Sequence, residues 1–527
     1  MRFLFKTHAF TKLKIYLSSL RSGTTLSTKS SSDVVYDRAF FLFFIFILAV
    51  VLFTFMDYGM NYDEPVHNQY GRYVLNYYSS FFHDKKLFSY YTLYMYGAFF
   101  DLICAIANKI SFMGEFETRH LINAFFGLFG LLGCWKIVRS SFNSKTAFWS
   151  VIFLTTIPMY YGHMFNNPKD IPLAALYIWG IYYLAQSMKR LPNIPKRLII
   201  KLGIIIGLAI GVRIGGLLLL AYTGLVFTLF FFRHPNFSCF KTLLAKIFYI
   251  SIITYLIMLV LWPWSHYALF TSIYSTAKEM LNFSRPIPLL FEGKNAVSTD
   301  LPWYYLPKFF FIQLPEILIL LLPLLFIFWR NFKKKEYLLL FLSAFFPLLF
   351  AMIMDSSLYD ATRHFLFIIP SLACLFGIVF VQLTERCNRK IVYVVTILFL
   401  IYHLSIMIKL HPNEYIYYNQ TVGGLSGAYQ NYETDYSGNS YKEGVSLLAN
   451  YLTDKNKKYK ICVCKYLDDP IVVSYYFPKN FILVNDPSDA QYYISFTRWY
   501  CDQQVAGNEI LDVERFGVPL TIIKELH

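Results

Sequence analysis

Long apolar runs recur along most of this chain and restrict its fold more than any other feature. They are limited by charges, prolines or polar turns, and they begin near residues 38, 90, 119, 146, 171, 198, 215, 243, 309, 337, 364 and 390. About 20 apolar residues are enough to cross a bilayer as a helix. With 56% hydrophobic and 15% charged residues, the chain is predicted to be an α-helical polytopic membrane protein with about 11–12 spans.

The basic residues predict which loops face the cytoplasm, because Lys and Arg are retained on that side of a membrane. They are concentrated in an N-terminal arm, residues 1–37, and in the segments 136–145, 189–201, 330–335 and 386–390. The net charge of +16 is therefore explained by orientation and by anionic lipid headgroups. No nucleic-acid partner is expected.

The loops 57–89 and 263–308 hold acidic and aromatic residues and are expected to face outward. The turn at 166–170 is also expected outside. Three apolar runs, which begin near residues 90, 119 and 146, separate the loop 57–89 from this turn. Both segments can face outward only if one of these three runs does not cross the membrane. We expect this of the run 90–112, which is rich in Tyr and contains Asp101.

The region after the last apolar run has a different composition. Residues 411–527 hold 10 basic and 14 acidic side chains, and we predict an external, small α/β domain that follows a transmembrane domain of residues 38–410. The helical pattern lies at 442–452, and the strand patterns lie at 459–464, 481–484, 492–496 and 520–523. Cys501 is expected either in an external disulfide or as a free buried thiol.

The pair Asp63-Glu64 follows the first apolar run directly. Adjacent carboxylates beside hydrocarbon are costly unless partners hold them, and such residues are functional candidates. An exposed, solvated loop is the alternative. The pattern favours catalysis at the membrane surface.

Two other polar clusters are predicted on the same side. In Asn166-Asn167-Pro168-Lys169-Asp170, Asp170 begins the next helix, either as an N-cap or as a further carboxylate of a shared cavity with Lys169. Arg213 is either a loop charge or a residue that reaches this cavity. Arg363 and His364 open a late span, where arginine can extend to the membrane surface or bind phosphate oxygens with its planar guanidinium. The aromatic loop 262–308 is either an interfacial belt or a cavity roof.

Together these motifs resemble the GT-C membrane glycosyltransferases. The resemblance is to their protein O-mannosyltransferase and aminoarabinose-transferase branch, including bacterial glycosyltransferase family 39 members. It is carried by Asp63-Glu64, by residues 167–172, by Arg363-His364, and by the tail segments 411–415, 418–419 and 423–425. It covers residues 38 to about 445 and implies a GT-C fold.

The resemblance also implies roles for individual residues. Asp63 takes the place of the catalytic base, with Glu64 as its partner and Asp170 as a second acidic residue. Lys85 or Lys86 is similar in position to a lysine that contacts the donor phosphate, although the sequence Asp84-Lys85-Lys86-Leu87 departs from the acidic-Lys-Pro pattern of that branch.

Independently of this resemblance, the residues fit sugar transfer from a polyprenyl phosphate. A sugar on polyprenyl phosphate already has a stable leaving group, so transfer needs a base for the acceptor hydroxyl and cations for the phosphate. We expect Asp63 as the base, with Glu64 or Asp170 positioning the acceptor. The predicted phosphate ligands are Lys85, Lys86, Lys169, Arg363 and His364. A single displacement predicts inversion at the anomeric carbon.

We expect no metal or other cofactor, although outer carboxylates could hold a divalent cation. The expected partners are a polyprenyl-phosphate-linked sugar, a glycan, lipid or protein acceptor, and membrane lipids. The expected location is the bacterial inner membrane, with a cytoplasmic N-terminus and an external active site. The alternative is a transporter or flippase for lipid-linked or anionic substrates, but no repeated halves are visible.

Overall fold

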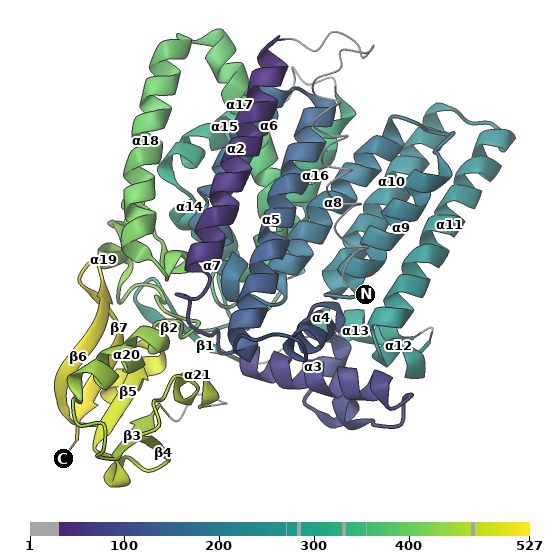
Figure 1. The fold of residues 1–527 in the computed structure, drawn as a ribbon. Coiled ribbons are helices and arrows are strands. Elements are labelled where there is room, and N and C mark those ends of the chain that lie inside the picture. Colours follow the sequence, from purple (N-terminus) through teal and green to yellow (C-terminus); the bar gives the residue numbers. More distant parts are fainter. Residues whose placement is uncertain are drawn as a thin grey trace, which may run out of the picture.

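The structure of this protein is a computed structural model that describes residues 31–269, 271–281, 286–328, 334–354, 356–464 and 470–526. A bundle of helices carries a small sheet domain at one end (Figure 1). Within the described residues, seven segments are long and apolar enough to cross a membrane. They are α2 (Ser31–Thr54), α5 (Glu115–Ser141), η3 with α10 (Ile214–Arg233), α11 (Phe237–Leu261), α16 (Lys335–Ile353), η5 with α17 (Arg363–Arg386) and α18 (Arg389–Leu410).

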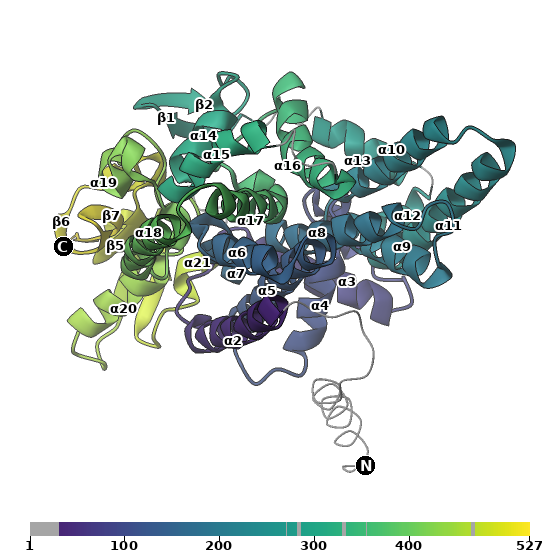
Figure 2. The same ribbon diagram turned by 90° about the horizontal axis from the view of Figure 1, so that it is seen from above.

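Other helices run within the same bundle. They are α6 (Ser144–Thr155), α7 (Pro158–Asn166), α8 (Asp170–Met188), α9 (Lys196–Ile210), α14 (Tyr305–Gln313) and α15 (Glu316–Phe328). Pro158 starts α7 because proline has no backbone N–H to donate and fits the first turn of a helix. Seen from above, α8 lies in the middle of the bundle (Figure 2), and most of its residues are buried. The protein is thus a multi-pass helical membrane protein.

The basic loops meet at one end of the bundle, as expected for loops on one side of a membrane. Lys189, at the end of α8, lies 3.4 Å from Glu336 of α16 and donates to the carbonyl of Ser140 at 2.8 Å. Arg139 of α5 pairs with Asp37 of α2 at 2.7 Å. Helix α2 already begins at Ser31, so residues 31–37 of the predicted arm are helical.

The opposite end is built from short elements. They are α3 (Glu64–Ser79), η1 (Lys86–Ser89), η2 (Leu93–Met95), α4 (Phe99–Asn108), α12 (Trp264–Tyr267), α13 (Ser272–Leu281), β1 (Pro288–Phe291) and β2 (Lys294–Val297). Helix α4 has 10 residues and is about 15 Å long, whereas a bilayer core is about 30 Å thick. The run 90–112 therefore folds as a short helix beside α3, below the bundle in Figure 1.

The segment after α18 packs against the bundle before the sheet begins. It contains η6 (Glu414–Ile416), η7 (Gln420–Val422) and α19 (Gly424–Ala428). The side-chain amide of Asn419 donates to the carbonyls of Phe311 and Leu314 at 2.7 and 2.9 Å. These contacts fix the start of the tail to the membrane domain.

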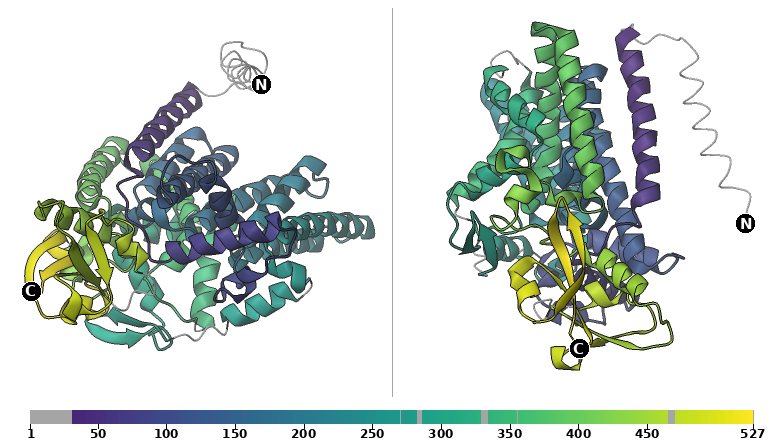
Figure 3. Two further views of the ribbon diagram at one scale, coloured as in Figure 1. Left: turned by 60° about the horizontal axis from the view of Figure 1, so that its bottom comes forward. Right: turned by 90° about the vertical axis from the view of Figure 1, so that its left-hand side faces the viewer.

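The C-terminal domain is a five-stranded sheet in the order β4-β3-β5-β7-β6. Its elements are α20 (Tyr441–Tyr451), β3 (Tyr459–Val463), α21 (Ile471–Ser474), β4 (Phe481–Val484), η8 (Pro487–Asp489), β5 (Tyr492–Phe496), η9 (Arg498–Gln503), β6 (Asn508–Arg515) and β7 (Val518–Glu525). Strands β4, β3 and β5 are parallel, and β7 pairs antiparallel with β5 and β6. A disulfide joins Cys464 to Cys501, and the domain lies at one end of the bundle (Figure 3).

Candidate active site

A cavity of about 1170 Å³ lies between the membrane domain and the sheet domain. Asp63, His67 and Lys169 line it from the bundle side, and Glu433 and Arg498 line it from the tail. Strand β1 also contributes to its wall, so part of the loop 262–308 roofs the cavity. The volume exceeds the range of about 300–1,000 Å³ found for drug-sized ligands, which leaves room for more than one substrate.

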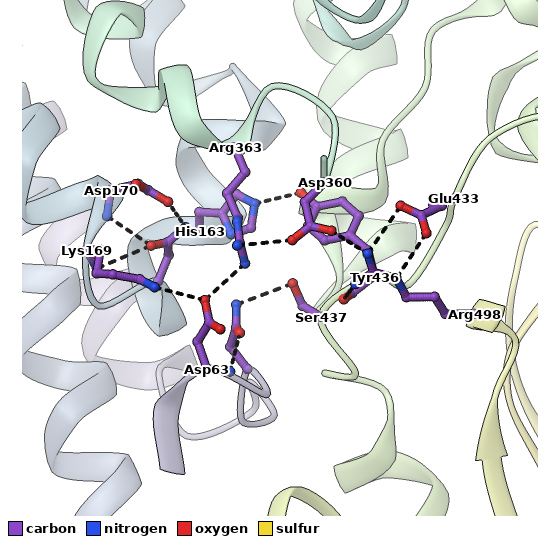
Figure 4. A network of polar contacts seen from close by, with 12 residues as sticks. Asp63, His163, Lys169, Asp170, Asp360, Arg363, Glu433, Tyr436, Ser437 and Arg498 are labelled. Carbon is purple, nitrogen blue, oxygen red and sulfur yellow. Dashed lines mark hydrogen bonds and ion pairs between the residues drawn. The ribbon is translucent and has the colours of Figure 1, made fainter. Parts of the chain in front are cut away.

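Asp63 stands between two cations at this cavity (Figure 4). Its Oδ2 lies 3.3 Å from Nζ of Lys169 and 3.2 Å from a terminal nitrogen of Arg363. Its side chain is 21% exposed, and no residue in the described part of the chain is bonded to Oδ1. One carboxylate oxygen of this cavity-lining residue therefore holds both cations, and the other is left without a partner among the described residues.

The backbone places Asp63 as the residue before α3, but its side chain makes no capping hydrogen bond there. Its N–H donates instead to Oδ1 of Asn61 at 3.0 Å. The preceding residue, Tyr62, donates its N–H to the carbonyl of Ser437 at 3.1 Å. Gly59 passes so close to this tail segment that an added Cβ would lie 2.0 Å from the carbonyl oxygen of Asn439. The first loop is thus held against the tail.

The charges around Asp63 keep it ionised. Burial alone would raise the pKa of Asp63, but the positive charges of Lys169 and Arg363 lower it well below its usual range. The ammonium of Lys169 also lies 5.2 Å from the ring centre of Tyr96, and the guanidinium of Arg363 lies 5.7 Å from that of Tyr359. Aromatic faces attract cations in this geometry, so the two cations are held in place from more than one side.

The charged row continues from Arg363 into the sheet domain (Figure 4). Arg363 lies 3.0 Å from Asp360, and Asp360 lies 2.6 Å from Arg498. Arg498 also pairs with Glu433 at 3.0 Å and donates to the carbonyl of Tyr436 at 2.7 Å. Positive and negative groups therefore alternate from Lys169 to Glu433, and Arg498 links the two domains.

Strained backbone marks both sides of this link. Asp360 has a φ of 55°, and Trp499, which follows Arg498, has a φ of 54°. Residues with side chains rarely adopt such left-handed conformations, which cost free energy and cluster at functional sites. The surrounding contacts must hold both segments in place.

Glu433 differs from Asp63 in its electrostatic environment. Burial raises the pKa of Glu433 to about 7, Arg498 opposes the shift, and the negative charge of Asp360 adds to it. Glu433 is thus the carboxylate of the row that changes charge near neutral pH.

Glu64 and Asp170, the other predicted catalytic carboxylates, do not line the cavity. Glu64 is buried and accepts from the N–H of Asn61 at 2.9 Å and from Nε2 of His120 at 3.0 Å. It therefore supports the loop of Asp63 from behind. Asp170 pairs with Arg213 and accepts from the side-chain amide of Asn167 at 3.0 Å. Arg213 is thus a partner of Asp170 beside the site.

The predicted phosphate ligands also divide into two groups. Lys169 lines the cavity and Arg363 meets it at Asp63, but Arg363, like Lys85, Lys86 and His364, is not among the lining residues. Lys85 and Lys86 are exposed, and the ammonium of Lys85 lies 5.3 Å from the ring centre of Tyr267. His364 packs edge-on against the ring of Tyr359, with centroids 4.5 Å apart. The structure thus gives these three residues other surroundings.

Sequence reasoning missed Glu433 and Arg498. Glu433 lies outside the tail motifs that carry the resemblance, and Arg498 lies beyond residue 445, where the resemblance ends. Asp360 stands three residues before Arg363, but its pairing with Arg498 bridges 138 residues of sequence. His67 lies four residues after Asp63, a spacing that brings two side chains to the same face of a helix.

Metal binding has no obvious place at this site. In the part of the chain that the structure describes, no group of three or more His, Cys, Asp or Glu side chains could hold a metal ion. Asp63 and Asp170 are already paired with cationic side chains. The absence of a metal requirement stays a prediction.

Comparisons with known proteins agree with the expected family. Residues 77–264 match the family model described as dolichyl-phosphate-mannose-protein mannosyltransferase. No curated protein sequence matches the chain.

Solved structures show the fold over nearly the whole length. ArnT from Cupriavidus metallidurans bound to undecaprenyl phosphate has a TM-score of 0.55 at 12% identity, over 93% of this chain and 98% of that one. The apo state of ArnT has a TM-score of 0.52, with the same identity and coverage. The chain therefore has the GT-C fold of ArnT, which confirms the resemblance to the GT-C membrane glycosyltransferases that its sequence predicts.

Proposed function

We propose that this protein transfers a sugar from a polyprenyl-phosphate donor to an acceptor hydroxyl, with inversion at the anomeric carbon. The observation that carries the proposal is Asp63, held between Lys169 and Arg363 at a large cavity. Two cations suit a departing phosphate, and a carboxylate beside them suits the attacking hydroxyl. The match to ArnT bound to undecaprenyl phosphate supports a lipid-linked donor.

Lys169 and Arg363 would hold the phosphate as its negative charge grows. Preorganised cations of this kind stabilise the transition state because they need not reorganise during the reaction. Removing one such group typically lowers kcat by about 100-fold to 1,000-fold. Their contacts with Tyr96 and Tyr359 would keep the two cations near the phosphate position.

Asp63 would accept the hydroxyl proton through Oδ1, the oxygen that does not contact the two cations. In the absence of a donor, the two cations lower the basicity of this carboxylate. Phosphate that binds Lys169 and Arg363 would neutralise part of their charge and raise the basicity of Asp63. Donor binding would therefore activate the base, and acceptor attack would follow donor binding.

The site favours an enzyme over a transporter. Transporters commonly place their substrate site near the middle of the bilayer, between paired broken helices. Here Asp63 directly precedes α3 and Arg498 directly follows the loop after β5, and α3 and the sheet domain both lie at one end of the bundle (Figure 1). We further propose a bacterial inner-membrane location with this end external, which fits the basic loops at the opposite end and the Cys464–Cys501 disulfide.

The proposal is tested with membranes that contain the protein and with radiolabelled sugars on undecaprenyl phosphate and dolichyl phosphate. Transfer to an endogenous or added glycan, lipid or protein acceptor is the expected result. The product should carry the anomeric configuration opposite to that of the donor. Retention of configuration, or no transfer from any polyprenyl-phosphate sugar, would contradict the proposal.

A further inference from the structure

His67 is a titratable residue of the cavity that the proposed chemistry leaves unused. It lies in the first turn of α3, one helical turn after Asp63, and its N–H donates to the carbonyl of Asp63 at 3.1 Å. Its side chain lines the same cavity. The two side chains are therefore neighbours at one site.

The imidazole of His67 is held by a buried carboxylate. Its Nδ1 lies 2.7 Å from Oδ2 of Asp101, and Oδ1 of Asp101 accepts from Arg119 at 2.7 Å. All three side chains are at most 5% exposed. Because a carboxylate is an acceptor, Nδ1 carries the proton and Nε2 keeps its lone pair. No residue within the described ranges is hydrogen-bonded to Nε2.

The backbone is shaped to build this contact. Asp101 lies in the first turn of α4, the short helix that runs beside α3. The two helices approach closely at Gly71, one turn after His67, where an added Cβ would lie 2.6 Å from the carbonyl oxygen of Asp101. The guanidinium of Arg119 rests over the ring of Phe100, 5.3 Å from its centre. Neighbouring parts of α3, α4 and α5 thus fix one imidazole.

Such a buried group of charges is costly to form. Removing an Asp and an Arg from water carries a desolvation penalty that their attraction often fails to offset, so burial alone does not explain them as stabilisers. A carboxylate behind an imidazole does have a defined chemical effect. It fixes the tautomer and stabilises the imidazolium that forms when the ring accepts a proton.

We propose that His67 is a second proton acceptor of the transfer reaction, with Asp101 and Arg119 as its positioning residues. This inference rests on the proposed function. The acceptor oxygen forms the new bond to the anomeric carbon, and the electron pair of the breaking bond goes to the phosphate oxygen. The hydroxyl proton passes to Oδ1 of Asp63 and from there to Nε2 of His67. It leaves to solvent after the product departs.

Passing the proton from Asp63 to His67 removes a difficulty that Asp63 would have as the only base. Lys169 and Arg363 hold the pKa of Asp63 well below its usual range, so its protonated form is unfavourable. The imidazole of His67, which lines the same cavity, offers the proton a second acceptor. Asp101 lies 2.7 Å from this imidazole, the ring centre of Tyr96 lies 6.4 Å from its centre, and Asp63 and Lys169 line the cavity with it.

The test compares His67→Gln and Asp101→Asn with wild type by kcat, pH profile and affinity for undecaprenyl phosphate. His403→Gln is the matched control, because His403 is equally buried and bonds the carbonyl of Thr156 at 2.7 Å away from the cavity. We expect His67→Gln to lower kcat about 100-fold. The rise of kcat with pH that one imidazole produces should disappear in this variant. Undecaprenyl phosphate affinity should stay within about 2-fold of wild type, which shows a folded site.

Asp101→Asn should lower kcat in the same direction with unchanged undecaprenyl phosphate affinity, and His403→Gln should keep the wild-type pH profile. If His67→Gln binds undecaprenyl phosphate normally and retains the kcat and pH profile of wild type, the inference is wrong while the proposed function stands. If His67→Gln does not fold, a wild-type kcat and pH profile in Asp101→Asn overturns it. If wild type transfers no sugar, the proposed function fails and the inference fails with it.

Discussion

The guanidinium of Arg498 lies 2.6 Å from Oδ1 of Asp360, and this contact makes the sheet domain part of the site. Asp360 in turn lies 3.0 Å from Arg363, which holds Asp63. A side chain of the C-terminal domain is therefore two contacts away from the proposed base. The domain is better described as a wall of the cavity than as an appendage.

Replacing Arg498 should destabilise the protein strongly. Arg498→Met leaves the largely buried Glu433 without its cation and Asp360 with Arg363 alone, and breaking a buried pair typically costs about 3–5 kcal/mol. The measurement is thermal unfolding of the purified protein. Lys308→Met is the control, because Lys308 and Glu292 form a partly exposed pair, which is typically worth about 0–1 kcal/mol. Equal losses of stability in the two variants would contradict this assignment.

Replacing Lys169 should reduce sugar transfer much more than replacing Lys85. Lys169→Met removes a cation that contacts Asp63 at the cavity, so kcat should fall by about 100-fold to 1,000-fold. Lys85→Met removes an exposed cation outside the lining residues and should cause a much smaller loss. Steady-state transfer assays measure both variants. A larger loss in Lys85→Met would favour the assignment based on family resemblance.

Glu433 should give stability a dependence on pH. Its pKa is raised to about 7 in the folded protein, above the value of about 4.3 for a free Glu side chain. The stability that Glu433 contributes is fully present below the pKa of its side chain in the unfolded chain, and it is lost as pH rises through about 7. Asp63 adds no pH dependence of stability between these two values, because its pKa in the folded protein is lowered.

Thermal midpoints between pH 5 and pH 8 measure this effect. The midpoint of wild type should fall as pH rises, and Glu433→Gln, which resembles the protonated form, should lose most of that fall. An equal fall in Glu433→Gln and in wild type would show that Glu433 does not change charge in this range.

Removing divalent cations should leave transfer intact. Asp63 and Asp170 are paired with Lys169, Arg363 and Arg213, so these carboxylates do not need a metal to balance their charge. The assay is sugar transfer in membranes washed with EDTA. A loss of activity that Mg²⁺ or Mn²⁺ restores would show that a metal takes part.

Local patterns in the sequence predicted much of the architecture. The strand patterns at 459–464, 481–484 and 492–496 correspond to β3, β4 and β5, and the pattern at 442–452 corresponds to α20. Strand β6 (Asn508–Arg515) escaped notice because it is an edge strand, and charged residues interrupt its apolar alternation. Strand alternation identifies a buried face better than it identifies an exposed edge.

The site was less predictable than the fold. Asp63, Lys169 and Arg363 were found because each stands in a polar motif beside an apolar run, where charge needs an explanation. Glu64 shares the motif of Asp63 but faces His120, since adjacent residues at a helix start point in different directions. Arg498 could not be found, because its role depends on how a separate domain docks.

The most direct test of the central claim is sugar transfer from a polyprenyl-phosphate donor by wild type and by Asp63→Asn. The variant keeps the shape of the side chain but removes the base, so transfer should fall by at least about 100-fold. Undecaprenyl phosphate should bind Asp63→Asn at least as tightly as wild type, because Lys169 and Arg363 lose a competing carboxylate. Equal transfer by wild type and Asp63→Asn would contradict the account.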